Sequence, residues 1–174
     1  MIFSVGKVTV TRVEETYLPT YPAKQIFPEW SDEINKKHAH WLAPHHYEPN
    51  GGLIKLSVHS WLLRVGGRNI LIDTCCGNNK FKPNRPFWTN LNTNYPERLA
   101  AAGARPEDID VVMCTHLHHD HVGWNTLQRD GKWVPTFPKA RYVFSKPDFD
   151  AFYAACDSRS GGSAARRECG GRSA

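Results

Sequence analysis

The hydrophobic pattern of the chain is a series of short segments, most of which predict strands. Residues 8–10 and 54–58 alternate apolar with polar side chains, as half-buried strands do. Residues 60–65 and 69–73 flank Gly66-Gly67, an arrangement typical of a β-hairpin. Residues 109–114 form a mainly apolar run that predicts a buried strand. These segments indicate a sheet at the centre of the fold.

Helices and turns are predicted between and after these strands. Residues 96–102 predict a short helix, with proline in its first turn and glycine just past its end. Asp130-Gly131 predicts a second hairpin. Residues 141–145 predict a last strand, and residues 147–155 a last helix. The fold class is therefore α/β or α+β.

The composition changes abruptly near the end of the chain. The 19 residues from 156 to 174 include four glycines, four serines, four arginines and three alanines, and no Ile, Leu, Val, Met or aromatic residue. Such a segment cannot bury apolar surface, so residues 156–174 are expected to be a disordered tail. The mixture is typical of a GC-rich gene read out of frame. We therefore interpret residues 1–155 as a partial domain, truncated or frameshifted after about residue 155.

Charge and cysteine content narrow the class of protein only slightly. The 174-residue chain has a net charge of +5, without a stripe of Lys and Arg interleaved with aromatic residues, so no nucleic-acid partner is expected. Its five cysteines have no C-x-x-C spacing. No run resembles a signal peptide or is long enough to cross a membrane, so we expect reduced thiols in a cytoplasmic protein without a membrane partner.

One stretch carries a recognisable chemistry. Directly after the strand at 109–114, four potential metal ligands fall within six residues: His116, His118, Asp120 and His121. Imidazole and carboxylate groups suit zinc and neighbouring divalent metals. In an extended segment the side chains at 116, 118 and 120 would share a face, and a helical turn at 121 would bring that histidine beside Asp120. The alternative is a polar loop with solvated histidines.

This H-x-H-x-D-H run resembles the metal-binding motif of the metallo-β-lactamase-fold hydrolases. The resemblance extends upstream to residues 70–74, which include Asp73, and downstream to residues 122–126. With residues 133–138 it is most similar to the lactonase-like and esterase-like branch, and it covers about residues 1–155. The fold that it implies is the N-terminal half of an αββα sandwich. The apolar face of such a half-sandwich, with Ile70, Ile72, Val111 and Met113, would be partly uncovered and would favour self-association.

The resemblance also implies roles for single residues. His116 and His118 would bind a first metal, Asp120 and His121 a second, and Asp73 would orient the site through hydrogen bonds. Asp120 would also orient the nucleophile. Intact relatives hold two ions, but their remaining ligands come from the second half of the fold. We therefore expect this chain to bind one divalent ion, zinc by preference, or none.

The implied activity is hydrolysis of a lactone, an ester or a related small substrate through a metal-bound hydroxide. One alternative is a catalytically inactive half-fold, and another is a nucleic-acid-processing member of the same fold. In similar hydrolases an insertion such as residues 15–52 lies over the active site, so Trp30, Trp41 and Tyr47 are candidate walls of a substrate pocket. A packed surface loop is the other interpretation of this segment. A second metal site among its four histidines (His38, His40, His45 and His46) is less favoured, since no carboxylate or cysteine completes it.

Overall fold

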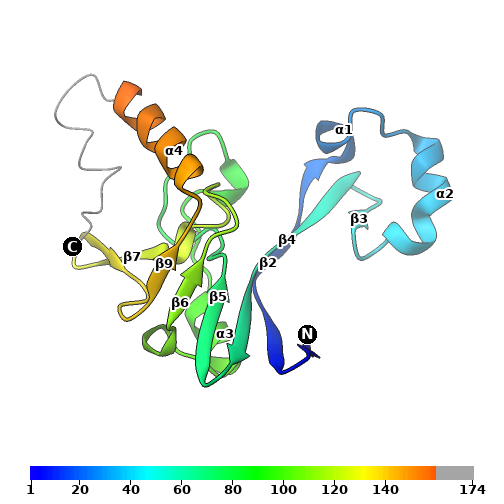
Figure 1. The fold of residues 1–174 in the computed structure, drawn as a ribbon. Helices are drawn as coiled ribbons and strands as arrows, with labels where there is room; N and C mark the ends of the chain where they lie inside the picture. The colour runs from blue at the N-terminus through cyan, green and yellow to red at the C-terminus, as the bar shows by residue number, and fades with distance from the viewer. Residues whose placement is uncertain (160–174) are drawn as a thin grey trace. The chain divides into compact units, whose positions relative to one another are not determined.

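The computed structural model describes residues 1–159, in two compact units. Unit 1 consists of residues 1–15 and of the chain from residue 59 onward, and unit 2 consists of residues 16–58. Two long strands, β2 (Val8–Pro22) and β4 (Leu53–Val65), have residues in both units. Figure 1 labels the elements along the chain.

A mixed sheet forms the centre of unit 1. Besides β2 and β4 it contains β1 (Ile2–Val5), β5 (Arg68–Ile72), β6 (Val111–Met113) and β9 (Arg141–Val143), in the order β1-β2-β4-β5-β6-β9. The β4–β5 pair is antiparallel, whereas β6 runs parallel to both β5 and β9. The expected sheet-centred class, matching half of a sandwich, is confirmed.

The described residues cover only one face of this sheet. Leu62, Leu71 and Val112 lie side by side in the register, and each is fully buried. The helix α3 (Tyr95–Ala101) lies against this face, where the hydroxyl groups of Tyr95 and Ser60 are 2.6 Å apart. Because side chains alternate along a strand, the neighbouring positions point to the other face.

That other face, here called the open face, carries a second apolar set. One row of the register is Trp61–Ile72–Met113–Val143, and the next contains Leu63, Ile70 and Val111. Within the described residues, Met113 is 41% exposed and Val143 is 37% exposed, against 0% for Val112 between the two rows. The partly uncovered face expected from the sequence is therefore present.

The predicted turns and helices lie where their sequence signals are. Gly66 and Gly67 form the β4–β5 turn with φ of 58° and 74°, values that favour glycine. The helix α3 ends just before Gly103. The second hairpin joins β7 (Thr126–Arg129) to β8 (Lys132–Pro135). Three single-turn helices complete the connections: η1 (Pro86–Trp88), η2 (Pro106–Asp108) and η3 (Gly123–Asn125).

The end of the last helix differs from the sequence prediction. The helix α4 (Lys146–Arg159) includes the first four residues of the predicted tail, 156–159. The rest of the predicted disordered tail lies outside the described residues. Among the residues that the structure describes, no helix combines the length and the apolar character needed to span a membrane.

Unit 2 is not a loop but a small packed structure. It contains the ends of β2 and β4, with α1 (Ala23–Ile26), α2 (Asp32–Leu42) and β3 (Tyr47–Glu48) between them. The helix α2 begins after Ser31, whose hydroxyl oxygen accepts a hydrogen bond from the Ile34 amide at 3.3 Å. The prolines of this segment lie outside the helix, which is why their number did not prevent it.

Candidate metal centre

The H-x-H-x-D-H run follows β6 directly, but it is not extended. Residues 115–122 form bends and turns, and the single-turn helix η3 follows them. The expected sharing of one face by residues 116, 118 and 120 therefore does not apply, since strand periodicity needs an extended backbone. The expected helical turn at residue 121 is also absent, because η3 begins two residues later.

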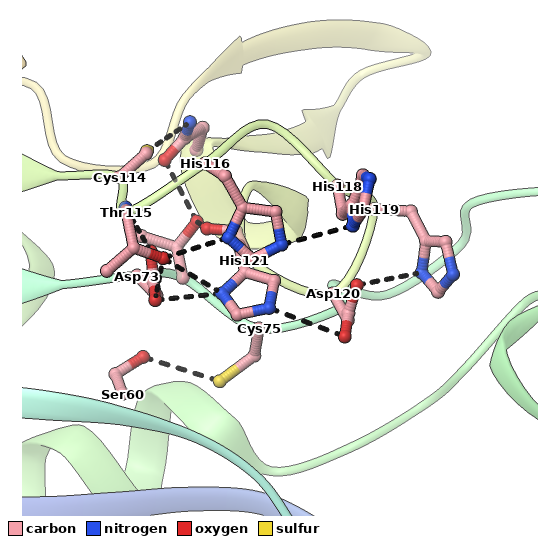
Figure 2. A network of polar contacts seen from close by, with 12 residues as sticks. Ser60, Asp73, Cys75, Cys114, Thr115, His116, His118, His119, Asp120 and His121 are labelled. Atoms are coloured by element: carbon pink, nitrogen blue, oxygen red, sulfur yellow. Dashed lines mark hydrogen bonds and ion pairs between the residues drawn. The ribbon is translucent and has the colours of Figure 1, made fainter. Parts of the chain in front are cut away.

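Asp73 ties this loop to the end of β5. Its carboxylate accepts hydrogen bonds from the Thr115 amide at 2.7 Å and from the Thr115 hydroxyl at 2.8 Å. The Nδ1 atom of His121 lies 2.8 Å from the same carboxylate (Figure 2). Because a carboxylate only accepts hydrogen bonds, this contact requires a proton on Nδ1 of His121. Asp73 itself is only 8% exposed.

The four predicted ligands are close together and form two pairs. His116 Nε2 lies 3.1 Å from His118 Nδ1. His121 Nε2 lies 3.5 Å from an oxygen of Asp120. The rings of His116 and His121 adjoin, with centroids 3.9 Å apart, so the two pairs are neighbours. Figure 2 shows His119 on the far side of Asp120 from the other imidazoles.

The spacing within each pair suits zinc. Two ligand atoms of a tetrahedral zinc, each ~2.1 Å from the ion, are separated by about 3.4 Å. The 3.1 Å and 3.5 Å distances are close to this value. Within residues 1–159, however, no group of three or more His, Cys, Asp or Glu side chains is arranged around a single point. The described residues therefore supply two pairs of potential zinc ligands, but no single site with three or four ligands.

Backbone hydrogen bonds hold the C-terminal end of the motif loop against Thr74 and Cys75. The Thr74 amide donates to the His121 carbonyl, and the Trp124 amide donates to the Thr74 carbonyl, both at 2.7 Å. The Gly123 amide donates to the Cys75 carbonyl at 2.7 Å. A Cβ atom at Gly123 would lie 1.9 Å from the backbone of Cys76, so only glycine permits this approach.

Glu15 holds the same segments together, although no sequence pattern pointed to it. This carboxylate is 2% exposed and accepts hydrogen bonds from the Cys76 amide at 2.7 Å and from the Trp124 indole at 2.6 Å. It also accepts from the Gly77 amide and from the Thr93 hydroxyl. It therefore joins the end of β5 to η3, on either side of the metal motif. The available signal was an acidic residue at an inward position of a strand, which has to be partnered when buried.

The adjacent cysteines belong to the core. Cys75 and Cys76 are fully buried, and Cys75 Sγ lies 3.3 Å from the Ser60 hydroxyl. Burial, with a smaller contribution from Glu15, raises the pKa of the Cys75 thiol well above its usual value and that of Cys76 to about 12. Because metals bind the thiolate, these thiols are poor ligands at neutral pH.

The candidate pocket residues lie in unit 2, where two of them line a cavity. Trp30 and Trp41 belong to the wall of a cavity of about 540 Å³. Tyr47 is buried beside Trp30, with ring centroids 5.3 Å apart. The four histidines of unit 2 make no group that could hold a metal, within the residues described. The interpretation of residues 15–52 as a mere loop is replaced by a packed unit with an aromatic cavity.

Comparison with known proteins identifies a family whose sequences this chain matches. The model of the metallo-beta-lactamase superfamily matches residues 53–158. An N-acyl homoserine lactonase, AiiB, of Agrobacterium fabrum is 32% identical over 107 residues, which cover 56% of this chain and 36% of the lactonase. The N-acyl homoserine lactonase AiiB of Rhizobium rhizogenes matches to the same extent. The chain thus spans little more than a third of the length of these curated relatives.

Solved structures agree on the fold. A probable metal-dependent hydrolase from Staphylococcus aureus superposes with a TM-score of 0.66 at 21% identity, over 87% of this chain and 52% of that one. AidC, a dizinc quorum-quenching lactonase, superposes with a TM-score of 0.64 at 20% identity, over 86% of this chain and 46% of that one. At these identities the likeness is one of fold alone.

Proposed function

Because the chain belongs to the metallo-beta-lactamase superfamily of hydrolases, we propose that it carries part of a metal site for the hydrolysis of a small lactone or ester. The observation that supports this proposal is that the potential ligands lie in two adjacent pairs, His116 with His118 and Asp120 with His121. Asp73 is hydrogen-bonded to His121 of the second pair. The alternative of a solvated polar loop does not account for three hydrogen bonds to one buried carboxylate.

Each residue has a role in the proposal. In a site completed by further protein ligands, His116 and His118 would hold one divalent ion, and His121 and Asp120 a second, with zinc the preferred metal. When bound, such ions lower the pKa of a water toward neutrality and polarise a carbonyl oxygen. Asp73 keeps the His121 proton on Nδ1, so that Nε2 is free to act as a ligand. Asp120 would hold its ion and orient the attacking nucleophile.

The similar proteins support the choice of substrate class. Two lactonases are 32% identical to the chain over 107 residues. We therefore place a lactone first and a simple ester second. Trp30 and Trp41 remain our candidates for contact with the apolar part of the substrate, and the buried Tyr47 would support Trp30. We place the protein in the cytoplasm, which is supported by the free thiols of Cys75, Cys76 and Cys114.

Zinc binding by the 174-residue chain tests the site. We expect weak binding of a single ion, because each pair supplies two protein ligands whereas catalytic zinc usually has three. His118→Ala should abolish this binding, as measured by calorimetric titration. His40→Ala, which removes an exposed histidine of unit 2, is the matched control and should bind zinc like the unmodified chain.

A lactone assay run in parallel tests the activity. We expect the zinc-loaded chain to hydrolyse N-hexanoyl homoserine lactone no faster than free zinc, because two ligands leave each ion loosely held. Binding of two ions, with turnover that His118→Ala removes, would show instead that these residues are a working hydrolase. Zinc binding that is unchanged in His118→Ala would refute the proposed site.

We also propose that the open face mediates self-association. Met113 lies at its centre and is 41% exposed, and exposed apolar patches favour association. Met113→Lys is expected to shift the chain toward monomer in sedimentation velocity experiments over a range of concentrations. Phe81→Lys is the control, since Phe81 is 73% exposed but lies outside the sheet. An unmodified chain that stays monomeric at all concentrations would contradict the proposal.

A further inference from the structure

Two half-buried lysines lie beside the metal motif. Lys80 and Lys82 belong to the segment between β5 and η1, and both are partly buried. Among the described residues neither forms an ion pair with a carboxylate. Placing two cations in a partly desolvated place without an anion is unfavourable.

The contacts of the two ammonium groups are neutral ones. Lys80 Nζ donates to the Thr126 hydroxyl at 2.9 Å and lies 3.9 Å from the centroid of the Trp133 ring. Lys82 Nζ donates to the Cys76 carbonyl at 2.9 Å. These contacts satisfy some N–H donors but bring no carboxylate to Lys80, and the carboxylates of Glu15 and Asp120 offset the burial of Lys82 only in part.

The lysines are held in place rather than loosely exposed. The stem of Lys80 occupies space left by Gly77, where a Cβ would be 2.8 Å from Lys80 Cε. The Asn90 amide donates to the Lys80 carbonyl, and the Lys82 amide donates to the Thr89 hydroxyl. A positioned side chain loses less conformational entropy on binding a ligand, so the arrangement is suited to recognition.

Their position relates them to the metal motif. Gly77 packs against Gly123, which follows the motif by two residues. Burial lowers the pKa of Lys82, and the nearby Cys76, Glu15 and Asp120 act in the opposite direction.

We propose that Lys80 and Lys82 form a binding site for a small oxyanion, a carboxylate or phosphate group, beside the metal motif. The ligand would supply the negative charge that the protein leaves out, and the flanking Trp133 would contact an apolar part attached to it. This site goes beyond the proposed hydrolysis and does not need a bound metal. Its failure would therefore leave the proposed function intact.

The charge of Lys80 sets the pH range of binding. Burial and the neighbouring Lys82 lower the pKa of Lys80 to about 8. The ammonium is therefore present below about pH 8 and lost above it, so anion binding should weaken as the pH rises through this value. Hexanoate is the suitable probe, because its own charge does not change between pH 7 and pH 9.

The test is calorimetric titration of the full, chelator-treated chain with hexanoate and, separately, with inorganic phosphate. At pH 7 we expect Lys80→Met to weaken hexanoate binding about tenfold, which corresponds to ~1.4 kcal/mol. At pH 9 this difference should largely disappear. Lys80→Arg should retain binding at both pH values, because a guanidinium stays protonated.

The control and the contrary outcomes are clear. Lys139→Met removes an exposed lysine outside the site and should not change binding, and circular dichroism establishes that each variant is folded. Binding of both probes, or of phosphate alone, in a Lys80-dependent manner supports the proposal and identifies the preferred oxyanion. No binding of either probe, or equal binding by Lys80→Met and the unmodified chain, overturns it.

Discussion

Gly123→Ala is expected to destabilise unit 1 more than any other single methyl group added to a glycine of the described chain. The new Cβ would lie 1.9 Å from the carbonyl carbon of Cys76 and 2.0 Å from its oxygen. These are backbone atoms, so no side-chain rotation can relieve the overlap. Overpacking costs up to about 3 kcal/mol and occasionally more. In a chain of this size we expect the Tm to fall by roughly 6 °C or more.

Gly51→Ala is the matched control for this experiment. Gly51 and Gly123 are the two described glycines whose φ is ordinary and whose added Cβ would meet a neighbour closer than 3 Å. At Gly51 the nearest atom is the end of the flexible Glu48 side chain. That variant should therefore lose much less stability. Equal melting temperatures for both variants would show that the Gly123 contact is less tight than described.

Asp73→Asn is expected to weaken zinc binding by about 10- to 100-fold, the usual effect of losing a partner that orients a metal ligand. An asparagine oxygen can still accept from the Thr115 amide. Its NH₂ group, however, would face the Thr115 hydroxyl and His121 Nδ1 in place of a carboxylate oxygen. His121 would then accept at Nδ1 and carry its proton on Nε2, where it blocks metal binding.

Asp130→Asn provides the control, because Asp130 is exposed in the β7–β8 turn and has φ of 51°, which asparagine tolerates. It should titrate with zinc as the unmodified chain does. Thermal melting without zinc separates a loss of folding from a loss of metal affinity. Unchanged zinc affinity in a folded Asp73→Asn chain would mean that the proton of His121 is not controlled by this carboxylate.

Gly123→Ala and Asp73→Asn test two different features of the site: the packing of the motif loop and the orientation of its metal ligands. Asp73 acts on the ligands directly, whereas Gly123 and Glu15 hold the C-terminal end of the motif loop against the segment that follows β5. The carboxylate of Glu15 is far from the motif in the sequence, yet its four hydrogen bonds join the segments that flank it. The geometry of the loop therefore depends on the packing of β2 as well as on β5 and β6.

The sequence by itself determined the local features of this protein. Alternating side chains located the strands, and the pairs Gly66-Gly67 and Asp130-Gly131 located the hairpin turns, since both signals depend on the conformation of a few adjacent residues. The motif also revealed the chemistry of the candidate ligands, because imidazole and carboxylate groups lie within six residues. These properties need no knowledge of distant contacts.

Only the tertiary structure decided how those groups are arranged. Strand periodicity predicted His116, His118 and Asp120 on one face, but bends in the loop pair His116 with His118 and His121 with Asp120. Glu15 and the lysines beside Gly77 became recognisable only through contacts with residues far along the chain. The helix α2 likewise replaced an expected loop. The physical reason is common to all: burial and partner choice depend on which segments pack together, and a local pattern does not contain that information.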